Sequence, residues 1–205
     1  LRQVRRVLVR APHVALHRLA RHDERIAAHV DGMVVNAAAA RRLVLEALAS
    51  PSPGGAFAAA TLALLTDDDA LLADLRALAA TLPQVFDGLA SALGWVGPAR
   101  LRGTVRDLLA SGMPALQRLG ITACALHRVD PGPALLAAAH SDDAPLRAAA
   151  LRCAGVLGRS DLLPMATASL HCASGVDAPE ARDVTLGAAL AACRFGQGAL
   201  ALTAL

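Results

Sequence analysis

Residues 142–164 read DDAPLRAAALRCAGVLGRSDLLP, a stretch that predicts a helix beginning at an acidic cap. Asp143 is a good N-cap residue, and Pro145 is well tolerated in the first helical turn behind it. Apolar residues then recur at spacings of four, three and four, which places them on one face of a helix. This stripe consists of Leu146, Ala150, Cys153 and Leu157. The stretch therefore begins with an amphipathic helix.

The second half of the stretch predicts a turn and a partner helix. Gly158 adopts the left-handed conformation easily and is expected to end the first helix. Ser160 is expected to cap a second helix that begins with DLLP and continues towards His171. The acids and the cysteine of this stretch then have structural roles.

The same pattern recurs along the chain at a nearly constant interval. Five prolines, each at the start of an Ala/Leu-rich run, are separated by 30, 31, 31 and 34 residues: Pro53, Pro83, Pro114, Pro145 and Pro179. Periods of this length are typical of stacked structural repeats. The second helices are predicted near 67–82, 98–111, 132–141, 160–173 and from 198. Thr66, with Asp69 three residues later, resembles a capping box for the first of these.

Composition supports an all-α fold. The chain of 205 residues is rich in Ala and Leu, which are strong helix formers, and has no Tyr, one Trp and three Phe. We predict an α-solenoid of stacked antiparallel helix pairs, with an N-terminal helical segment over 1–50. The repeat array is predicted over 51–205, with about five helix pairs, the last one truncated.

Charge and cysteine content give few functional signals. Residues 1–42 carry nine Arg against three acids, a basic segment that could contact nucleic acid or an anionic surface, or could be a solvated helix face. Each of the four cysteines lies in an apolar run and is expected to pack as a small core residue, which favours a reducing, cytoplasmic location. The longest uncharged run, 47–66, is interrupted by PSPGG, so no membrane span is predicted.

Residues 143–158, DAPLRAAALRCAGVLG, resemble a HEAT-type repeat, with an acidic cap, a proline, a Leu-Arg pair and small residues before Leu-Gly. A narrower resemblance is to an uncharacterised bacterial HEAT-repeat family whose genes lie near type VI secretion accessory genes. It is carried by RAPH (10–13), LARHDERIAAHVDGM (19–33), SALGW (91–95), ALHRVDPG (125–132) and GRSDLLP (158–164). The resemblance implies a solenoid that binds proteins, and it supplies no catalytic residues. It also implies that Arg147 bridges to an acid of a neighbouring unit, with Asp142, Asp143 and Asp177 as the possible partners.

The candidate reactive groups have simpler explanations. His13 and His17 are four residues apart, but the sequence around them lacks an HExxH arrangement. His22-Asp23-Glu24-Arg25 is interpreted as the first turn of a helix that Asp31-Gly32 closes. Asp67-Asp68-Asp69 is interpreted as a helix N-terminus, since the distal ligands of a calcium loop do not follow. His171 and Cys172 are adjacent in a helix and so point about 100° apart. No catalytic or metal site and no cofactor is predicted.

The leading hypothesis is a non-enzymatic scaffold or adaptor that binds a protein partner, an effector or a secretion component, along its second helices. Weak candidates for partner contacts are Arg102, Arg106, His140 and His171. The alternative is a nucleic-acid-binding, DNA-glycosylase-like HEAT protein. Its support is weak, because such sites stack bases on aromatic side chains and this chain has few of them. A lyase or isomerase for bilin-like pigments is a third class, which no residue favours.

Overall fold

The computed structural model of the chain describes residues 1–9, 11–172 and 179–204, although the side chains of some helical residues in these ranges, His171 among them, lie outside the description. Every regular element in the described ranges is helical, and none is a strand. The all-α prediction is therefore confirmed. The chain divides into two compact units, Leu1–Leu101 and Arg102–Leu205, and each is described by itself.

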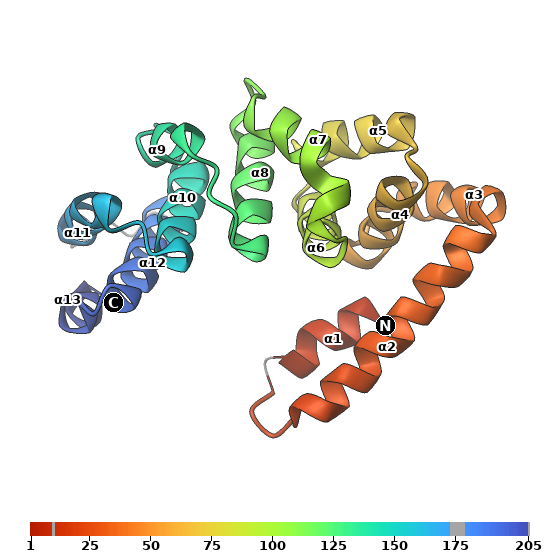
Figure 1. The fold of residues 1–205 in the computed structure, drawn as a ribbon, viewed down its shortest axis with the longest axis horizontal. Helices are drawn as coiled ribbons and strands as arrows, with labels where there is room; N and C mark the ends of the chain where they lie inside the picture. Colours follow the sequence, from red (N-terminus) through yellow and green to blue (C-terminus); the bar gives the residue numbers. More distant parts are fainter. Residues whose placement is uncertain (10, 173–178, 205) are drawn as a thin grey trace. The chain divides into compact units, whose positions relative to one another are not determined.

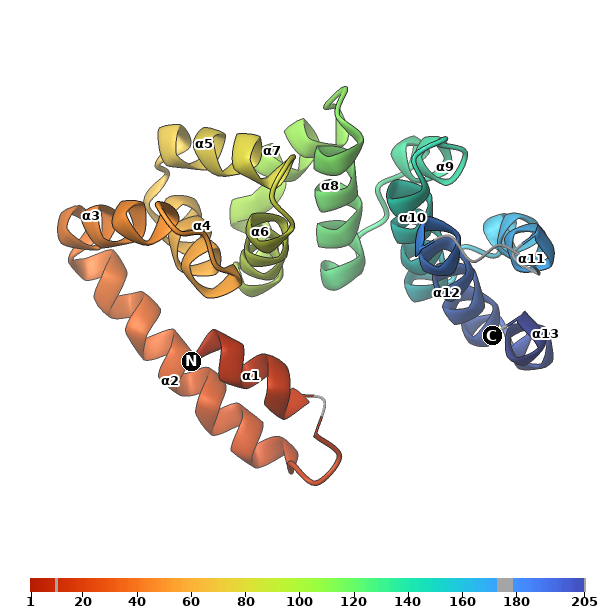
Figure 2. The same ribbon diagram turned by 180° about the vertical axis from the view of Figure 1, so that it is seen from behind.

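The first unit contains six complete helices within the described residues and the start of a seventh (Figures 1 and 2). They are α1 (Arg2–Val9), α2 (Leu16–Val35), α3 (Ala37–Leu48), α4 (Pro53–Thr66), α5 (Asp69–Ala79), α6 (Pro83–Trp95) and α7 (Pro98–Leu109). In both views α1 lies alongside α2, and the two form a hairpin whose tip points away from α3. We call the segment from α1 through α2 the N-terminal hairpin.

The second unit takes in most of α7 and the remaining helices of the described chain. They are α8 (Pro114–His127), α9 (Pro133–Ala139), α10 (Ala144–Leu157), the 3₁₀ turn η1 (Ser160–Leu162), α11 (Leu163–Cys172), α12 (Pro179–Arg194) and α13 (Gly198–Ala204). Its core is aliphatic and rich in alanine, with Ile121, Leu135, Leu146 and Leu151 fully buried.

The five periodic prolines open helices, as the sequence predicts. Pro53, Pro83, Pro114 and Pro179 are the first residues of α4, α6, α8 and α12, and Pro145 is the second residue of α10. Proline favours these positions because its fixed φ suits the first turn and its missing N–H would have no helical partner there. The following helices begin close to the predicted second-helix positions, with α13 starting at Gly198.

The opening stretch has the predicted cap at its first helix. The Oδ1 of Asp143 accepts a hydrogen bond of 2.7 Å from the backbone N–H of Leu146, and Gly158 ends α10 at φ 72°. The apolar stripe is also confirmed, since Cys153 is completely buried. The prediction for Ser160 is wrong: it is the first residue of η1, and no side chain caps that turn. A 3₁₀ turn lets the chain enter α11 without an N-cap side chain.

The predicted capping box at the start of α5 is also wrong. Thr66 is still part of α4, and its Oγ1 donates to the carbonyl of Leu62. Asp68 is the cap, because its Oδ1 accepts from the N–H of Leu71 at 3.0 Å. Asp67 occupies the left-handed position at the end of α4, with φ 55°. Three consecutive acids thus supply a turn residue, a cap and a first-turn charge.

Helix α2 is longer than predicted. The sequence reading places a helix start at Asp23 and Glu24 and a helix end at Asp31-Gly32, whereas α2 runs unbroken from Leu16 to Val35. The reason is a continuous buried stripe, to which His22, Ile26 and Val30 belong. Packing of such a stripe outweighs the weak local preference of an acid for a first turn and of Gly32 for a helix end.

Glycine allows the first helices of successive pairs to approach closely. A Cβ at Gly88 of α6 would lie 2.4 Å from the Cβ of Ala56 in α4. A Cβ at Gly155 of α10 would lie 2.6 Å from the Cα of Ala191 in α12. These distances are far below van der Waals contact, so both helix pairs need a residue without a side chain. The small side chains of Ala56 and Ala191, which face these glycines, permit the close approach.

The ion pair expected of Arg147 is absent among the described residues, and a different arginine links two turns. Arg147 donates through Nη1 to the carbonyl of Ser141, 2.6 Å away, and pairs with neither Asp142 nor Asp143 among the described residues. Asp177 lies outside them. Arg159, after α10, instead binds both carboxylate oxygens of Asp130, after α8, at 3.0 and 2.9 Å. The tie therefore joins two turns, because an arginine in a turn reaches the next turn more easily than one in a packed helix.

The long uncharged run is divided as predicted. Helix α3 ends at Leu48 and α4 begins at Pro53, so the run is not one helix. Across the described parts of the chain, no helix has both the length and the apolar character needed to cross a bilayer.

Candidate functional site

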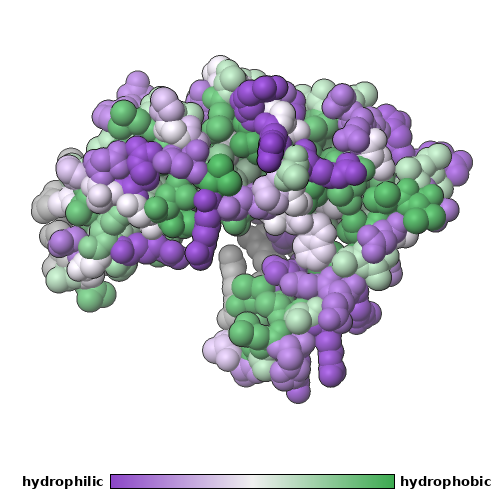
Figure 3. All heavy atoms as spheres, viewed as in Figure 1, coloured by the Kyte–Doolittle hydropathy of each residue, from purple (hydrophilic) through white to green (hydrophobic). Residues whose placement is uncertain are grey.

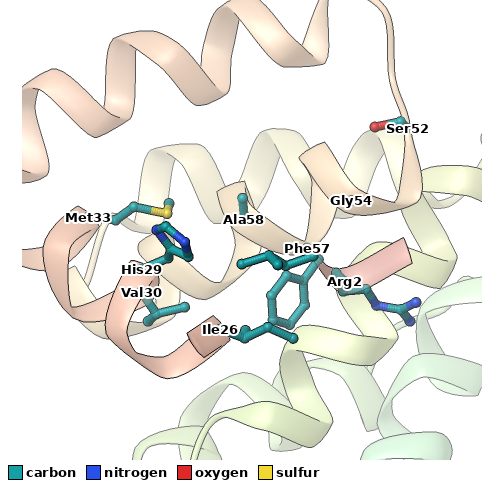
Figure 4. Close-up of a pocket in the computed structure, with 10 residues that line it drawn as sticks. Arg2, Ile26, His29, Val30, Met33, Ser52, Gly54, Phe57 and Ala58 are labelled. Atoms are coloured by element: carbon teal, nitrogen blue, oxygen red, sulfur yellow. The ribbon is translucent and has the colours of Figure 1, made fainter. Parts of the chain in front are cut away.

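A cavity of about 420 Å³ opens in the first unit where α1, α2 and α4 meet (Figure 4). We call it the apolar pocket. Its lining consists of Leu1, Arg2, Ile26, His29, Val30, Met33, Ser52, Gly54, Phe57 and Ala58. Figure 4 shows the side chains of Ile26, Val30 and Phe57 converging on it, with Met33 and His29 beside them. Its size falls within the range of small-ligand sites and of pockets that receive an anchor side chain.

Helix α1 closes one side of this pocket and is held on α2 by polar contacts. The Nε of Arg5 lies 2.5 Å from Oδ1 of Asp23, and its Nη2 lies 3.0 Å from Oδ2. Asp23 raises the pKa of the Arg5 guanidinium through this bond. The buried ring of His22 meets the carbonyl of Leu1 at 2.8 Å. Asp23 and His22 are thus structural groups that fix the hairpin.

Helix α4 supplies the floor, and the rigidity of the pocket comes from the core beneath it. Phe57 is 5% exposed and packs edge-on against Trp95, with ring centroids 6.0 Å apart and planes at 88°. This T-shaped arrangement is the favourable one for two aromatic rings. Ser52 caps α4 by accepting from the N–H of Gly55 at 3.1 Å. The floor is therefore preformed.

The polar groups around the pocket do not converge on a point inside it. The Arg2 guanidinium points away from the apolar side chains in Figure 4 and donates to Ser91 of α6. The hydroxyl of Ser52 is engaged in its cap. His29 is exposed at the edge. Sites that orient small substrates need several polar groups aimed at the ligand, so this arrangement suits an apolar group held by shape.

The weak candidates for partner contacts lie on different helices of the second unit. Arg102 and Arg106 are exposed and four residues apart, which places them on one face of α7. The Nε of Arg106 is 3.9 Å from Oδ1 of Asp107. His140 is exposed at the end of α9, where its Nδ1 meets the carbonyl of Leu136 at 2.9 Å. His171 belongs to α11, and its side chain lies outside the described residues. Their role in binding stays a prediction.

The histidine and acidic motifs do not assemble. His13 lies in the turn before α2, so it shares no helix face with the exposed His17. Among the described residues, no three His, Cys, Asp or Glu side chains come together as a metal ion would require. Asp68 binds Arg41 of α3 at 2.6 Å, and the hydrogen bond from Leu71, with this arginine, holds the pKa of the carboxyl below its ordinary value.

The cysteines are only partly as predicted. Cys124 and Cys153 are buried, and burial raises the pKa of Cys153 to about 12 and also raises that of Cys124. Cys193 is exposed at the end of α12, so the expectation that it packs in the core is wrong. The stripe of α12 that packs inward contains Val184, Ala188 and Ala192, and Cys193 falls one position beyond it. The side chain of Cys172 lies outside the described residues.

Sequence reasoning missed the apolar pocket because it divided α2. A helix that starts near Asp23 and ends at Asp31-Gly32 contains Ile26, His29 and Val30 but leaves His22 and Met33 outside their stripe. The signal was present in the spacing of Leu19, Ile26, Val30 and Met33, which fits one face of a single long helix.

Comparisons of this chain with protein-family models, with curated proteins and with solved structures find no match.

Proposed function

We propose that this chain is a non-enzymatic protein-binding scaffold whose helix pairs stack as a HEAT-like α-solenoid. The periodic proline starts and the close packing of α4 on α6 and of α10 on α12 support this arrangement. In a solenoid each unit covers the apolar face of its neighbour, and the stack presents an extended surface for a partner. A role beside a secretion apparatus, with an effector or spike component as partner, belongs to the same proposal.

The observation that carries the proposal is the apolar pocket. It is lined mainly by aliphatic, aromatic and methionine side chains; Arg2 points away from it, Ser52 caps α4, and His29 is exposed at its edge. Tight protein complexes concentrate their binding energy where an apolar side chain of one partner fills such a pocket on the other. Methionine at the wall, here Met33, adapts to differently shaped anchors.

A pocket-filling variant tests this function. Ala58 lines the pocket and is half-buried, so Ala58→Arg would place a long charged side chain in the anchor position. Leu43→Glu is the matched control, because Leu43 is 65% exposed on α3 and does not line the pocket. Both variants are compared with the wild type by affinity capture from the native cells, and then by titration with the purified captured protein.

We expect a protein that the wild type and Leu43→Glu capture and that Ala58→Arg releases. The expected loss of affinity is about thirtyfold, which corresponds to one hot-spot contact of ~2 kcal/mol. Circular dichroism establishes that the three proteins are equally helical. Capture that Ala58→Arg leaves unchanged would remove the pocket as the binding site, and the absence of any specific partner would count against a scaffold.

A further inference from the structure

The tip of the N-terminal hairpin exposes large apolar side chains, which folded proteins normally bury. Val7 and Val9 near the end of α1 are 66% and 54% exposed, and Leu16 at the start of α2 is 83% exposed. In Figure 3 the surface of this hairpin carries an apolar patch bordered by hydrophilic atoms. Exposed apolar side chains gathered near one end of a hairpin indicate a place where a protein meets another surface.

Three exposed arginines follow this tip along one side of α2. Arg18, Arg21 and Arg25 are exposed on α2, and none of them forms an ion pair with another described residue. Their spacing of three and four residues places them on one side of the helix. Residues 1–25 contain seven Arg against Asp23 and Glu24, a net charge of +5. Asp23 is moreover engaged by Arg5, so it does not neutralise the exposed arginines.

The order of these groups along the hairpin matches the layers of a membrane surface. A helical rise of 1.5 Å per residue places Arg18 and Arg21 about 3 and 7.5 Å beyond Leu16 along α2, and Arg25 about 13.5 Å beyond it. Apolar side chains of interfacial segments enter the bilayer by roughly 5–10 Å, and basic side chains remain among the head groups. With Leu16 inserted, Arg21 and Arg25 therefore lie near the head groups, and the long side chain of Arg18 reaches them from slightly deeper.

We propose that the N-terminal hairpin docks on an anionic lipid surface, with Val7, Val9 and Leu16 inserted and Arg18, Arg21 and Arg25 bound to lipid phosphates. The positive charge of the tip determines which kind of surface it binds. A hairpin with a net positive charge is attracted to acidic lipid head groups, and each arginine near such a surface strengthens binding about fivefold. This attachment is peripheral, and it leaves the apolar pocket to its own partner.

Vesicle co-sedimentation with the full chain tests the proposal. We expect binding to phosphatidylcholine vesicles that contain roughly 30 mol% phosphatidylglycerol, and little to vesicles of phosphatidylcholine alone. Binding is expected to fall when salt rises from about 20 mM to about 500 mM, because the screening length shortens from roughly 20 Å to roughly 4 Å. Equal binding to both kinds of vesicle would contradict the role of charge.

Two sets of variants separate the arginines from the apolar tip. The triple variant Arg18→Gln, Arg21→Gln and Arg25→Gln should lower partitioning about a hundredfold, at about fivefold per arginine. The double variant Val7→Ser and Leu16→Ser should lower it about tenfold, because half-inserted aliphatic groups lose part of their transfer free energy. All these positions are exposed, so circular dichroism and melting temperature should be unchanged.

Matched controls remove the same groups elsewhere on the described surface. Arg102→Gln with Arg106→Gln removes two exposed arginines, and Leu186→Ser with Leu202→Ser removes two exposed leucines. Both controls should bind vesicles as the wild type does. No binding to the anionic vesicles at low salt would overturn the proposal. A second result would also overturn it: binding to polyglutamate or DNA that depends on the three hairpin arginines, without binding to vesicles. The ligand would then be a soluble polyanion.

Discussion

Asp68 and Asp143 begin the helices α5 and α10 in the same way, each by accepting a backbone N–H three residues ahead. Each carboxylate satisfies one of the N–H groups that a helix start leaves without a helical partner. The neighbouring acids Asp69 and Asp142 make no comparable bond and are exposed. Position relative to the first turn therefore decides which acid of a cluster caps the helix.

Asp143→Ala should lower the free energy of unfolding by about 1 kcal/mol, the usual effect of losing a helix cap. The reason is that the N–H of Leu146 would lose its 2.7 Å bond to the carboxylate. Asp142→Ala is the control, and it should leave stability within about 0.5 kcal/mol of the wild type. Urea unfolding followed by circular dichroism measures both variants. Equal destabilisation by the two substitutions would show that general acidity of the turn, and not the cap, is what matters.

Burial sets the chemistry of the cysteines. Burial, together with the nearby thiol of Cys124 and the carboxylate of Asp130, raises the pKa of Cys153 to about 12. A raised pKa keeps this thiol neutral, so its contribution to stability is complete below pH 9 and is lost as pH rises towards about 12. Only the thiolate form reacts readily with alkylating agents.

Iodoacetamide at about pH 8 should therefore modify Cys193 in the folded protein and spare Cys124 and Cys153, since about one Cys153 thiol in ten thousand would be ionised. Accessibility predicts the same order of reactivity, because Cys193 is exposed on α12 and the other two thiols are buried. Peptide mass spectrometry assigns each modified site. All three should react after denaturation in urea. Modification of Cys153 in the folded state at the rate of Cys193 would mean that α10 is not packed as described.

Glycines determine how closely some helices pack. The absence of a side chain at Gly88 lets the backbone of α4 lie close to α6, because a Cβ at Gly88 would be 2.8 Å from the Phe57 nitrogen and from the Pro53 carbonyl oxygen. Gly103, by contrast, is exposed in the middle of α7, with no atom within 4 Å of where a Cβ would lie. The same residue type is required at one position and unfavourable at the other.

Gly88→Ala and Gly103→Ala should consequently have opposite signs. Gly88→Ala forces α4 and α6 apart and should destabilise the protein by about 2 kcal/mol, lowering Tm by roughly 4–8 °C. Gly103→Ala removes backbone freedom from the unfolded chain and should stabilise by about 0.5–1 kcal/mol. Thermal unfolding by calorimetry compares the two. A stabilising Gly88→Ala would contradict the close packing of these helices.

Sequence patterns predicted the elements of the array better than they predicted the N-terminal hairpin. Proline, the Asp143 cap and Gly158 are local signals, and they place helix ends where the structure has them. Helix α2 carries acids and Gly32 at positions that resemble ends, yet a buried stripe holds it together. The apolar pocket depends on α1 packing against that stripe, a long-range contact that no local signal encodes.

Two arginines form contacts between neighbouring pairs of helices. Arg159 joins Asp130 across 29 residues, and Arg100 reaches Asp67 at 3.6 Å and the carbonyl of Leu65 at 3.2 Å. In each case the turn after the first helix of one pair is linked to the start of the second helix of the following pair. Exposed pairs of this kind add little stability, about 0–1 kcal/mol each. Their similar places in two parts of the chain agree with the proposed repeat.

The solenoid proposal predicts the size of the molecule in solution. A compact chain of this length would have a radius of gyration of about 17 Å. Repeats that contact only their neighbours extend the chain in one direction, so a HEAT-like stack should give a clearly larger value and an asymmetric distance distribution. Small-angle scattering on a sample shown to be monomeric by light scattering measures both. A symmetric distribution with a radius near 17 Å would contradict the solenoid.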